Sequence, residues 1–166
     1  MSIAYEQRLK VFWLEAVADS DLEEVTVIEM NAGTNLTPYS PVAGVDRPSQ
    51  QNQASLAMLD DAFVSEEPGT WSVGPIGLTF TRDPGNEGSD HPWNIFEYGK
   101  SGYLVVAPDG EELFDSGSGV TDGADVSIYQ VSAHEPAEMP SAENTKQQFM
   151  VSFPVRRYVR RASVVA

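Results

Sequence analysis

A short stretch near the C-terminal end carries the clearest structural signal in the sequence, Gln148-Phe149-Met150-Val151-Ser152-Phe153. Successive side chains of a β-strand point to opposite faces, so Phe149, Val151 and Phe153 share one face. The pattern predicts a strand whose apolar face lies in a hydrophobic core.

The same kind of signal recurs along the rest of the chain. Val, Ile, Thr and aromatic residues gather in short runs bounded by Gly, Pro, Asn or Asp, which is typical of strands. The predicted strands are 8–17, 71–82, 102–106, 112–114, 125–132, 147–153 and 158–165. About seven strands with one or two short flanking helices predict a mainly β fold, a β-sandwich or barrel.

Two short helices are predicted among these strands. Ser20 and Glu23 fit a capping box, which predicts a helix of about ten residues running towards Met30. A second helix is predicted to end at Gly99, with Pro92 in its first turn.

The segment 38–53 differs from its surroundings in composition. It contains three prolines, one glycine and a run of glutamine and asparagine, with few apolar residues. Because such a segment cannot build a core of its own, we predict a long loop. Loops of this length in compact domains are usually functional or disordered.

Length and composition restrict the class of protein. A chain of 166 residues favours one domain, and 41% hydrophobic residues exclude a mostly disordered chain. Cysteine is absent, which excludes disulfides and thiolate chemistry. No apolar run reaches the roughly 18 residues of a membrane span.

Charge is unevenly distributed along the chain. It has 25 acidic and 10 basic residues, for a net charge of −15. Residues 1–143 carry −20 and the last 23 residues carry +5. A surface this acidic repels nucleic acid unless binding is confined to the C-terminal segment. Solubility alone is the plain alternative.

The basic residues near the C-terminus are concentrated in one segment, Arg156-Arg157-Tyr158-Val159-Arg160-Arg161. We interpret it as a docking arm for an acidic protein surface. A nucleic-acid patch, with an aromatic residue between two Arg pairs, and a solvated terminal strand are the alternatives. Since one chain offers both charge partners, the pattern favours head-to-tail self-assembly.

Catalytic and metal-binding patterns are missing from the sequence. His91 and His134 are 43 residues apart and fit no metal-ligand spacing. Neither a nucleophile elbow nor a phosphate-binding loop occurs. The acidic, glycine-rich segments 83–90 and 115–122 do not match the EF-hand pattern, and turn chemistry explains their composition. We therefore expect no enzyme activity, no cofactor and no metal.

The order of segments along nearly the whole chain resembles the major tail tube proteins of long-tailed, siphovirus-like bacteriophages, particularly those that infect actinobacteria. The segments that carry the resemblance are Arg8-Leu9-Lys10-Val11-Phe12-Trp13-Leu14, Asn31-Ala32-Gly33-Thr34-Asn35-Leu36-Thr37, the Pro/Gln-rich loop, Leu78-Thr79-Phe80-Thr81-Arg82-Asp83, Tyr98-Gly99-Lys100-Ser101-Gly102-Tyr103-Leu104-Val105-Val106, Val126-Ser127-Ile128-Tyr129-Gln130-Val131 and Gln148-Phe149-Met150-Val151-Ser152-Phe153.

This resemblance implies one tail-tube domain over residues 1–166, with an assembly loop at 38–53 and a basic C-terminal arm at 154–166. Six subunits would close a ring around a continuous inner β-barrel, and rings would stack into a hollow tube. DNA would pass through an acidic lumen during ejection. The implied partners are the chain itself and the tape measure, tail tip and tail terminator proteins, without a membrane. The implied location is the virion tail, after synthesis in the host cytoplasm.

Two sets of residues are expected to carry the assembly. The loop that reaches the next ring is assigned Val42, Val45, Asp46, Arg47, Pro48, Gln50, Gln51 and Gln53. The arm that docks between subunits is assigned Arg156, Arg157, Tyr158, Arg160 and Arg161. A head–tail connector, a secretion-tube-like ring protein and a β-sandwich module that binds a ligand or calcium are the alternatives.

Overall fold

The computed structural model describes residues 9–41, 44–56, 65–83, 85, 91–108, 119–140 and 146–166. The elements in these ranges are β1 (Lys10–Leu14), β2 (Glu24–Thr26), α2 (Val27–Ala32), β3 (Thr34–Asn35), the 3-10 helix η1 (Thr37–Tyr39), β4 (Val45–Asp46), β5 (Ser49–Leu56), β6 (Ser65–Val73), β7 (Ile76–Thr81), α3 (His91–Ile95), β8 (Ser101–Ala107), β9 (Asp125–Ser132), β10 (Ala137–Glu138), β11 (Gln148–Phe153) and β12 (Val155–Val165). The chain is therefore mainly β with few short helices, as predicted.

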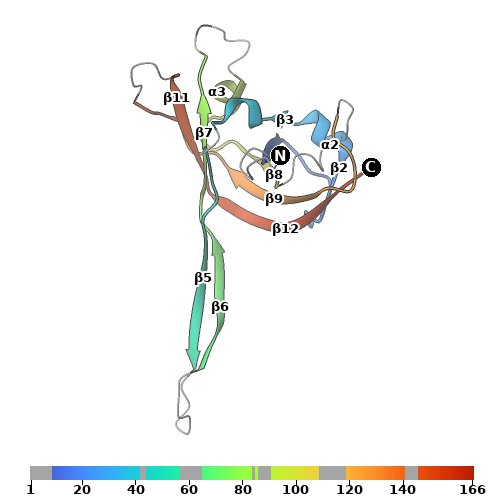
Figure 1. Ribbon diagram of the computed structural model, residues 1–166, viewed down its shortest axis with the longest axis vertical. Helices are drawn as coiled ribbons and strands as arrows, with labels where there is room; N and C mark the ends of the chain where they lie inside the picture. The colour runs from blue at the N-terminus through green and yellow to red at the C-terminus, as the bar shows by residue number, and fades with distance from the viewer. Residues whose placement is uncertain are drawn as a thin grey trace, which may run out of the picture.

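The strands form three sheets (Figure 1). A six-stranded sheet has the order β2-β12-β9-β8-β1-β3, and a four-stranded sheet has the order β10-β11-β7-β4. The third sheet is the hairpin of β5 and β6. Pro154 is the only residue between β11 and β12, so the chain passes from the four-stranded sheet into the six-stranded one almost without a break.

One hydrophobic core lies between the two larger sheets. The alternating apolar side chains of β7 and β11 are buried in it, which confirms the predicted strand with one buried apolar face at residues 148–153. Phe149, Val151 and Phe153 are each 0% exposed. Trp13 of β1 and Phe96, just after α3, fill the centre with edge-to-face rings 5.0 Å apart, a favoured aromatic geometry.

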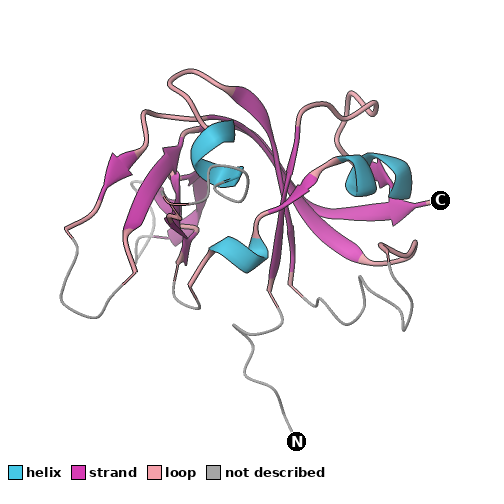
Figure 2. Cartoon of the chain, turned by 90° about the horizontal axis from the view of Figure 1, so that it is seen from above, coloured by secondary structure: helices cyan, strands magenta, loops and turns pink. Residues whose placement is uncertain are grey.

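A second core lies on the other face of the six-stranded sheet. There Phe12 and Leu14 of β1 pack with Val25, Met30 and other apolar residues of β2, α2, β8, β9 and β12. Neighbouring residues of β1 thus enter different cores, which explains why its sequence is continuously apolar rather than alternating. Figure 2 shows the C-terminus at one end of this body and the strands of the four-stranded sheet towards the other end.

The helix predicted from Ser20 begins later than expected. Residues 24–26 form β2, which pairs in parallel with the C-terminal end of β12. The helix starts after Thr26, whose side chain and that of Glu29 form a reciprocal capping box. The β-branched Val25 and Thr26 favour the strand, so the prediction chose the wrong capping residue. The short helix α3 has Pro92 in its first turn as predicted, but it ends at Ile95 instead of at Gly99.

The segment 38–53 is not one long loop, which corrects the prediction. It contains the end of η1, the strand β4 and the first half of β5. Residues 71–82 are not one strand either, because Gly74 and Pro75 separate β6 from β7. Composition predicted a loop for the first segment and one continuous strand for the second. Pairing of β4 with β7 and of β5 with β6 gives these residues their actual structure. Residues 112–114 and most of the glycine-rich segments 83–90 and 115–122 lie outside the described residues.

The predicted C-terminal arm is a strand of the body. β12 lies between β9 and β2, antiparallel to the first and parallel to the second. Ala162 and Val164 of β12 are buried in the second core. The basic residues therefore sit on a rigid scaffold instead of a free tail.

Candidate assembly surfaces

The hairpin of β5 and β6 projects away from the body along the longest axis of the molecule (Figure 1). Its strands are paired from Ser49 opposite Val73 to Leu56 opposite Ser65, with a register shift between Gln51 and Gln53. Eight residues at about 3.3 Å each give it a reach of roughly 26 Å. Among its described side chains, Ser49, Gln51, Trp71 and Ser72 are exposed.

The residues predicted to contact the next ring fall into three places. Val45 and Asp46 belong to β4 and pair with β7 inside the body. Arg47 and Pro48 link the body to the hairpin, and Gln50, Gln51 and Gln53 lie on β5. Val42 lies outside the described residues.

A pocket of about 350 Å³ lies where the hairpin joins the body. Its walls include Arg47, Trp71 from β6, Tyr129 from β9, and Tyr158 and Arg160 from β12. Tyr129 and Tyr158 are cross-strand partners with stacked rings 4.5 Å apart. Trp71 lies 5.4 Å from Tyr158 and is 53% exposed. We call this feature the root pocket.

The hydroxyl of Tyr129 stays protonated in the root pocket. Burial raises the pKa of Tyr129 to about 12, against the opposing charge of Arg47. Tyr158 stacks on the Tyr129 ring, and Arg47 lines the same pocket. The Arg47 guanidinium therefore lies beside an aromatic wall, which limits the number of conformations it can adopt.

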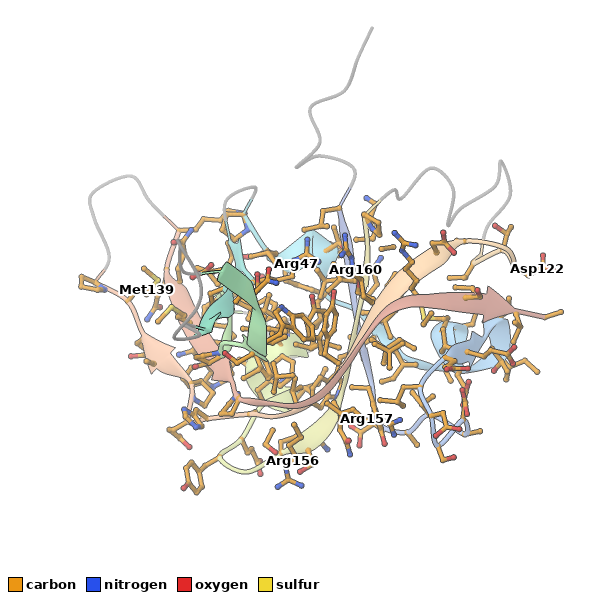
Figure 3. The ribbon with its side chains drawn as sticks, turned by 90° about the horizontal axis from the view of Figure 1, so that it is seen from below. Arg47, Asp122, Met139, Arg156, Arg157 and Arg160 are labelled. Atoms are coloured by element: carbon orange, nitrogen blue, oxygen red, sulfur yellow. The ribbon has the colours of Figure 1, made fainter. Side chains whose placement is uncertain are left out.

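The arginines of β12 do not form one surface. Two register shifts, between Val155 and Arg157 and between Val159 and Ala162, break the alternation of the strand. Figure 3 shows Arg160 beside Arg47 on one side of the body and Arg156 and Arg157 on the opposite side. The structure therefore separates residues that the sequence grouped together, and it brings Arg160 to Arg47, more than a hundred residues earlier.

Arg157 is engaged within its own chain. It donates a hydrogen bond of 2.5 Å to the backbone carbonyl of Ser20, and its Nη2 lies 3.6 Å from the Asp21 carboxylate. The Asp19 carboxylate also orders this turn, because it accepts hydrogen bonds from the backbone N–H groups of Asp21, Glu23 and Glu24. The same hydrogen bonds, first that from Asp21, lower the pKa of the Asp19 carboxyl. Arg157 thus fastens this turn to β12.

The described residues offer little support for other kinds of site. They contain no group of His, Asp and Glu that could hold a metal ion. None of the described helices is both long and apolar enough to cross a membrane. A second hollow, of about 570 Å³, is lined by Trp93, Glu97, Tyr98 and Glu135 among others, and is wide open.

Residues 65–70 of the second hairpin strand were not predicted as a strand, and Trp71 was not predicted as a site residue. The Gly74-Pro75 pair was the available signal, because it separates two runs of strand-forming residues. A break there would have left residues 65–73 as a separate strand able to pair with the segment before it.

Comparison with known proteins identifies the family. The sequence pattern of the family described as "Phage tail tube protein" matches residues 2–166. The chain belongs to the phage tail tube protein family. It is thus a structural component of a phage tail, as its resemblance implied, and the family is not a class of enzymes.

Solved structures show the same fold. The chain is similar to the SPP1 tail tube protein, determined by solid-state NMR and cryo-EM, with a TM-score of 0.60 and 12% identity over 96% of this chain and 79% of that one. A chain of the anti-feeding prophage baseplate gives a TM-score of 0.50 with 8% identity, over 96% of this chain and 94% of that one. No curated protein sequence is a significant match.

Proposed function

We propose that copies of this chain close into hexameric rings, and that the rings stack into a hollow tube with an acidic lumen through which DNA passes during ejection. The projecting hairpin of β5 and β6 is the observation that supports stacking of the rings. A hairpin of two strands is at best marginally stable in water. One that extends roughly 26 Å from its body therefore needs a partner surface.

A neighbouring subunit supplies that surface. Both strands of the hairpin have an open edge, with backbone N–H and C=O groups able to pair with another chain. The register of polar strands such as Ser49–Leu56 is weakly specified by side chains. Contact with the adjacent ring fixes the hairpin and converts an aggregation hazard into a defined joint.

The charge of the chain suits a conduit for DNA. A basic wall would bind phosphates along the whole tube, whereas a net charge of −15 per subunit leaves the DNA free to move. The four arginines of β12 and the tyrosine between them serve contacts between subunits in this arrangement, namely Arg156, Arg157, Tyr158, Arg160 and Arg161.

We further infer that the phage is long-tailed and siphovirus-like, with an actinobacterial host. The subunit is then made in the host cytoplasm and meets the tape measure, tail tip and tail terminator proteins during assembly. The order of sequence segments described above supports this assignment.

A shortened hairpin tests the proposal. Gln50 and Ser72 are register partners, so an Asn-Gly turn between them can replace residues 51–71, which removes Trp71 from Tyr158 but leaves the two larger sheets intact. Electron microscopy of the wild-type chain over a concentration series should show tubes with a regular axial repeat. The shortened variant should form rings that do not stack, while its circular dichroism and melting temperature stay close to wild type.

Two results would contradict the proposal. If the shortened variant forms tubes, the hairpin is not required for stacking. A wild-type chain that forms rings but never tubes, even with tail tip proteins present, would indicate a connector instead.

A further inference from the structure

The root pocket is basic and aromatic in character. The described residues that line it are arginine, serine, valine and aromatic residues, and none is acidic. On a chain with 25 acidic and 10 basic residues, two arginines gathered without a carboxylate between them are unusual. The local charge is opposite to that of the molecule as a whole.

The two guanidinium groups are held in place by different parts of the fold. Arg47 follows β4 and lines the pocket together with Tyr129, which is 4% exposed. Arg160 sits in the irregular part of β12, between Val159 and Ala162, where the pairing with β9 shifts. Both arginines line the pocket together with Ser49, Trp71 and Val73 at the foot of the hairpin.

Within the part of the chain that the structure describes, no carboxylate is paired with Arg160. Among the residues that the structure describes, Arg82, Lys100 and Arg157 form ion pairs with carboxylates, and Arg160 does not. An arginine fork against a flat aromatic wall is suited to bind a carboxylate through two parallel hydrogen bonds. Partial exclusion of water by the tyrosines and Trp71 strengthens such a pair.

We propose that the root pocket binds a carboxylate side chain from an acidic segment of a second copy of this chain, and so locks neighbouring subunits at the base of the hairpin. The identification of the partner rests on the proposed assembly. It is favoured by charge, because every neighbouring copy presents a strongly acidic surface. It is also favoured by position, because the pocket lies at the foot of the element that reaches the next ring.

Nucleic acid is a poorer fit to the same pocket. Binding to DNA requires a basic track that neutralises several successive phosphates. The pocket offers two arginines, and Arg156 and Arg157 lie on the opposite side of the body (Figure 3). The surrounding acidic surface repels a polyanion approaching from solution.

The first experiment measures assembly of the full chain. Arg47→Gln, Arg160→Gln and the double variant are compared with Lys10→Gln/Lys146→Gln, which removes the same charge outside the pocket. We expect the critical concentration for tube formation, measured by pelleting, to rise about tenfold or more in the double variant, because removing one partner of a desolvated charge pair costs at least that factor. We expect a change of less than about twofold in the control.

The second experiment tests the pocket in the unassembled chain. A hexaglutamate peptide is titrated while tryptophan fluorescence is recorded, since Trp71 lies in the pocket wall, Trp13 is buried and Trp93 lines the other hollow. A saturable change should occur in the wild type and in the lysine control. It should be absent in the arginine double variant and in Trp71→Phe. Circular dichroism of each variant confirms the fold, and the single Arg160→Gln change at an exposed residue guards against misfolding of the double variant.

The possible results distinguish the carboxylate site in the root pocket from the proposed assembly into tubes. If wild-type tubes form and the arginine variants assemble like the lysine control, the pocket has no role in docking and the tube assignment stands. If the wild type forms no ordered assembly but hexaglutamate still binds, the tube assignment fails and the carboxylate site stands. A saturable signal from a short DNA duplex, lost in the arginine double variant and absent with hexaglutamate, would overturn the proposal.

Discussion

Replacement of Glu29 tests how the end of the body at α2 is held together. One oxygen of its carboxylate accepts hydrogen bonds from the Thr26 N–H at 2.8 Å and the Thr26 hydroxyl at 2.9 Å. The other oxygen accepts one from the Ala18 N–H at 2.6 Å. In return, the Thr26 hydroxyl accepts a hydrogen bond from the Glu29 N–H at 3.2 Å. One side chain therefore caps the helix and fastens the preceding turn.

The magnitude follows from the bonds that are lost. Loss of a helix cap costs about 0.5–2 kcal/mol, and hydrogen bonds to a charged group contribute somewhat more than neutral ones. We expect Glu29→Ala to lower the free energy of unfolding by about 2 kcal/mol, or about 4–8 °C in melting temperature for a chain of this size. Glu29→Gln should cost about half as much, because its amide nitrogen cannot accept the hydrogen bond from Ala18.

The effect should depend on pH in a defined direction. Burial raises the pKa of Glu29, but hydrogen bonds from Thr26 and Ala18 outweigh it and leave the pKa below its ordinary value. The stabilisation is then complete above the unfolded-state pKa of about 4.3 and is lost as the pH falls through the folded-state pKa. The difference between wild type and Glu29→Gln should therefore shrink below about pH 4.

Urea unfolding followed by tryptophan fluorescence, at concentrations below assembly, provides the measurement. Glu23→Gln is the matched control, because Glu23 is exposed. The reasoning would be refuted if both Glu29 variants unfolded like this control, or if their destabilisation stayed constant from pH 7 to pH 3.

Three further predictions concern the cores and β12. Gly102→Ala places a methyl group 2.7 Å from Trp13 Cη2 and should destabilise the chain by about 1–3 kcal/mol in urea unfolding; no loss would mean that the Trp13 ring moves freely. Phe149→Ala empties the centre of the first core and should cost about 3–5 kcal/mol, visible in the same assay, and a cost under about 1 kcal/mol would contradict its full burial. Arg157→Ala breaks an exposed tie to the turn at Asp21 and should cost less than about 1 kcal/mol, with a difference that diminishes in high salt; a salt-independent loss of several kcal/mol would point to another role.

The fold class and several strands could be predicted from the sequence because their signals are local. β9 has the predicted bounds, residues 125–132, and β11 lies within one residue of its prediction. Alternation of apolar side chains along such a strand depends only on the strand itself and on one buried face. The start of α2 was predicted wrongly because two capping residues competed, and pairing of β2 with β12 decided between them.

The candidate site could be predicted only in part. Arg47, Tyr158 and Arg160 were singled out, but for two separate surfaces, and Trp71 and Tyr129 were not singled out at all. The sequence by itself determined the composition of the chain, its excess of negative charge and the identity of its strongest strands, because these properties reside in single residues or short runs. Only the tertiary structure decided that β5 and β6 form a projecting hairpin and that the last strand is built into the body. The physical reason is that strand partners and register shifts depend on contacts between segments far apart in the chain, and those contacts bring Arg47 and Arg160 to one pocket.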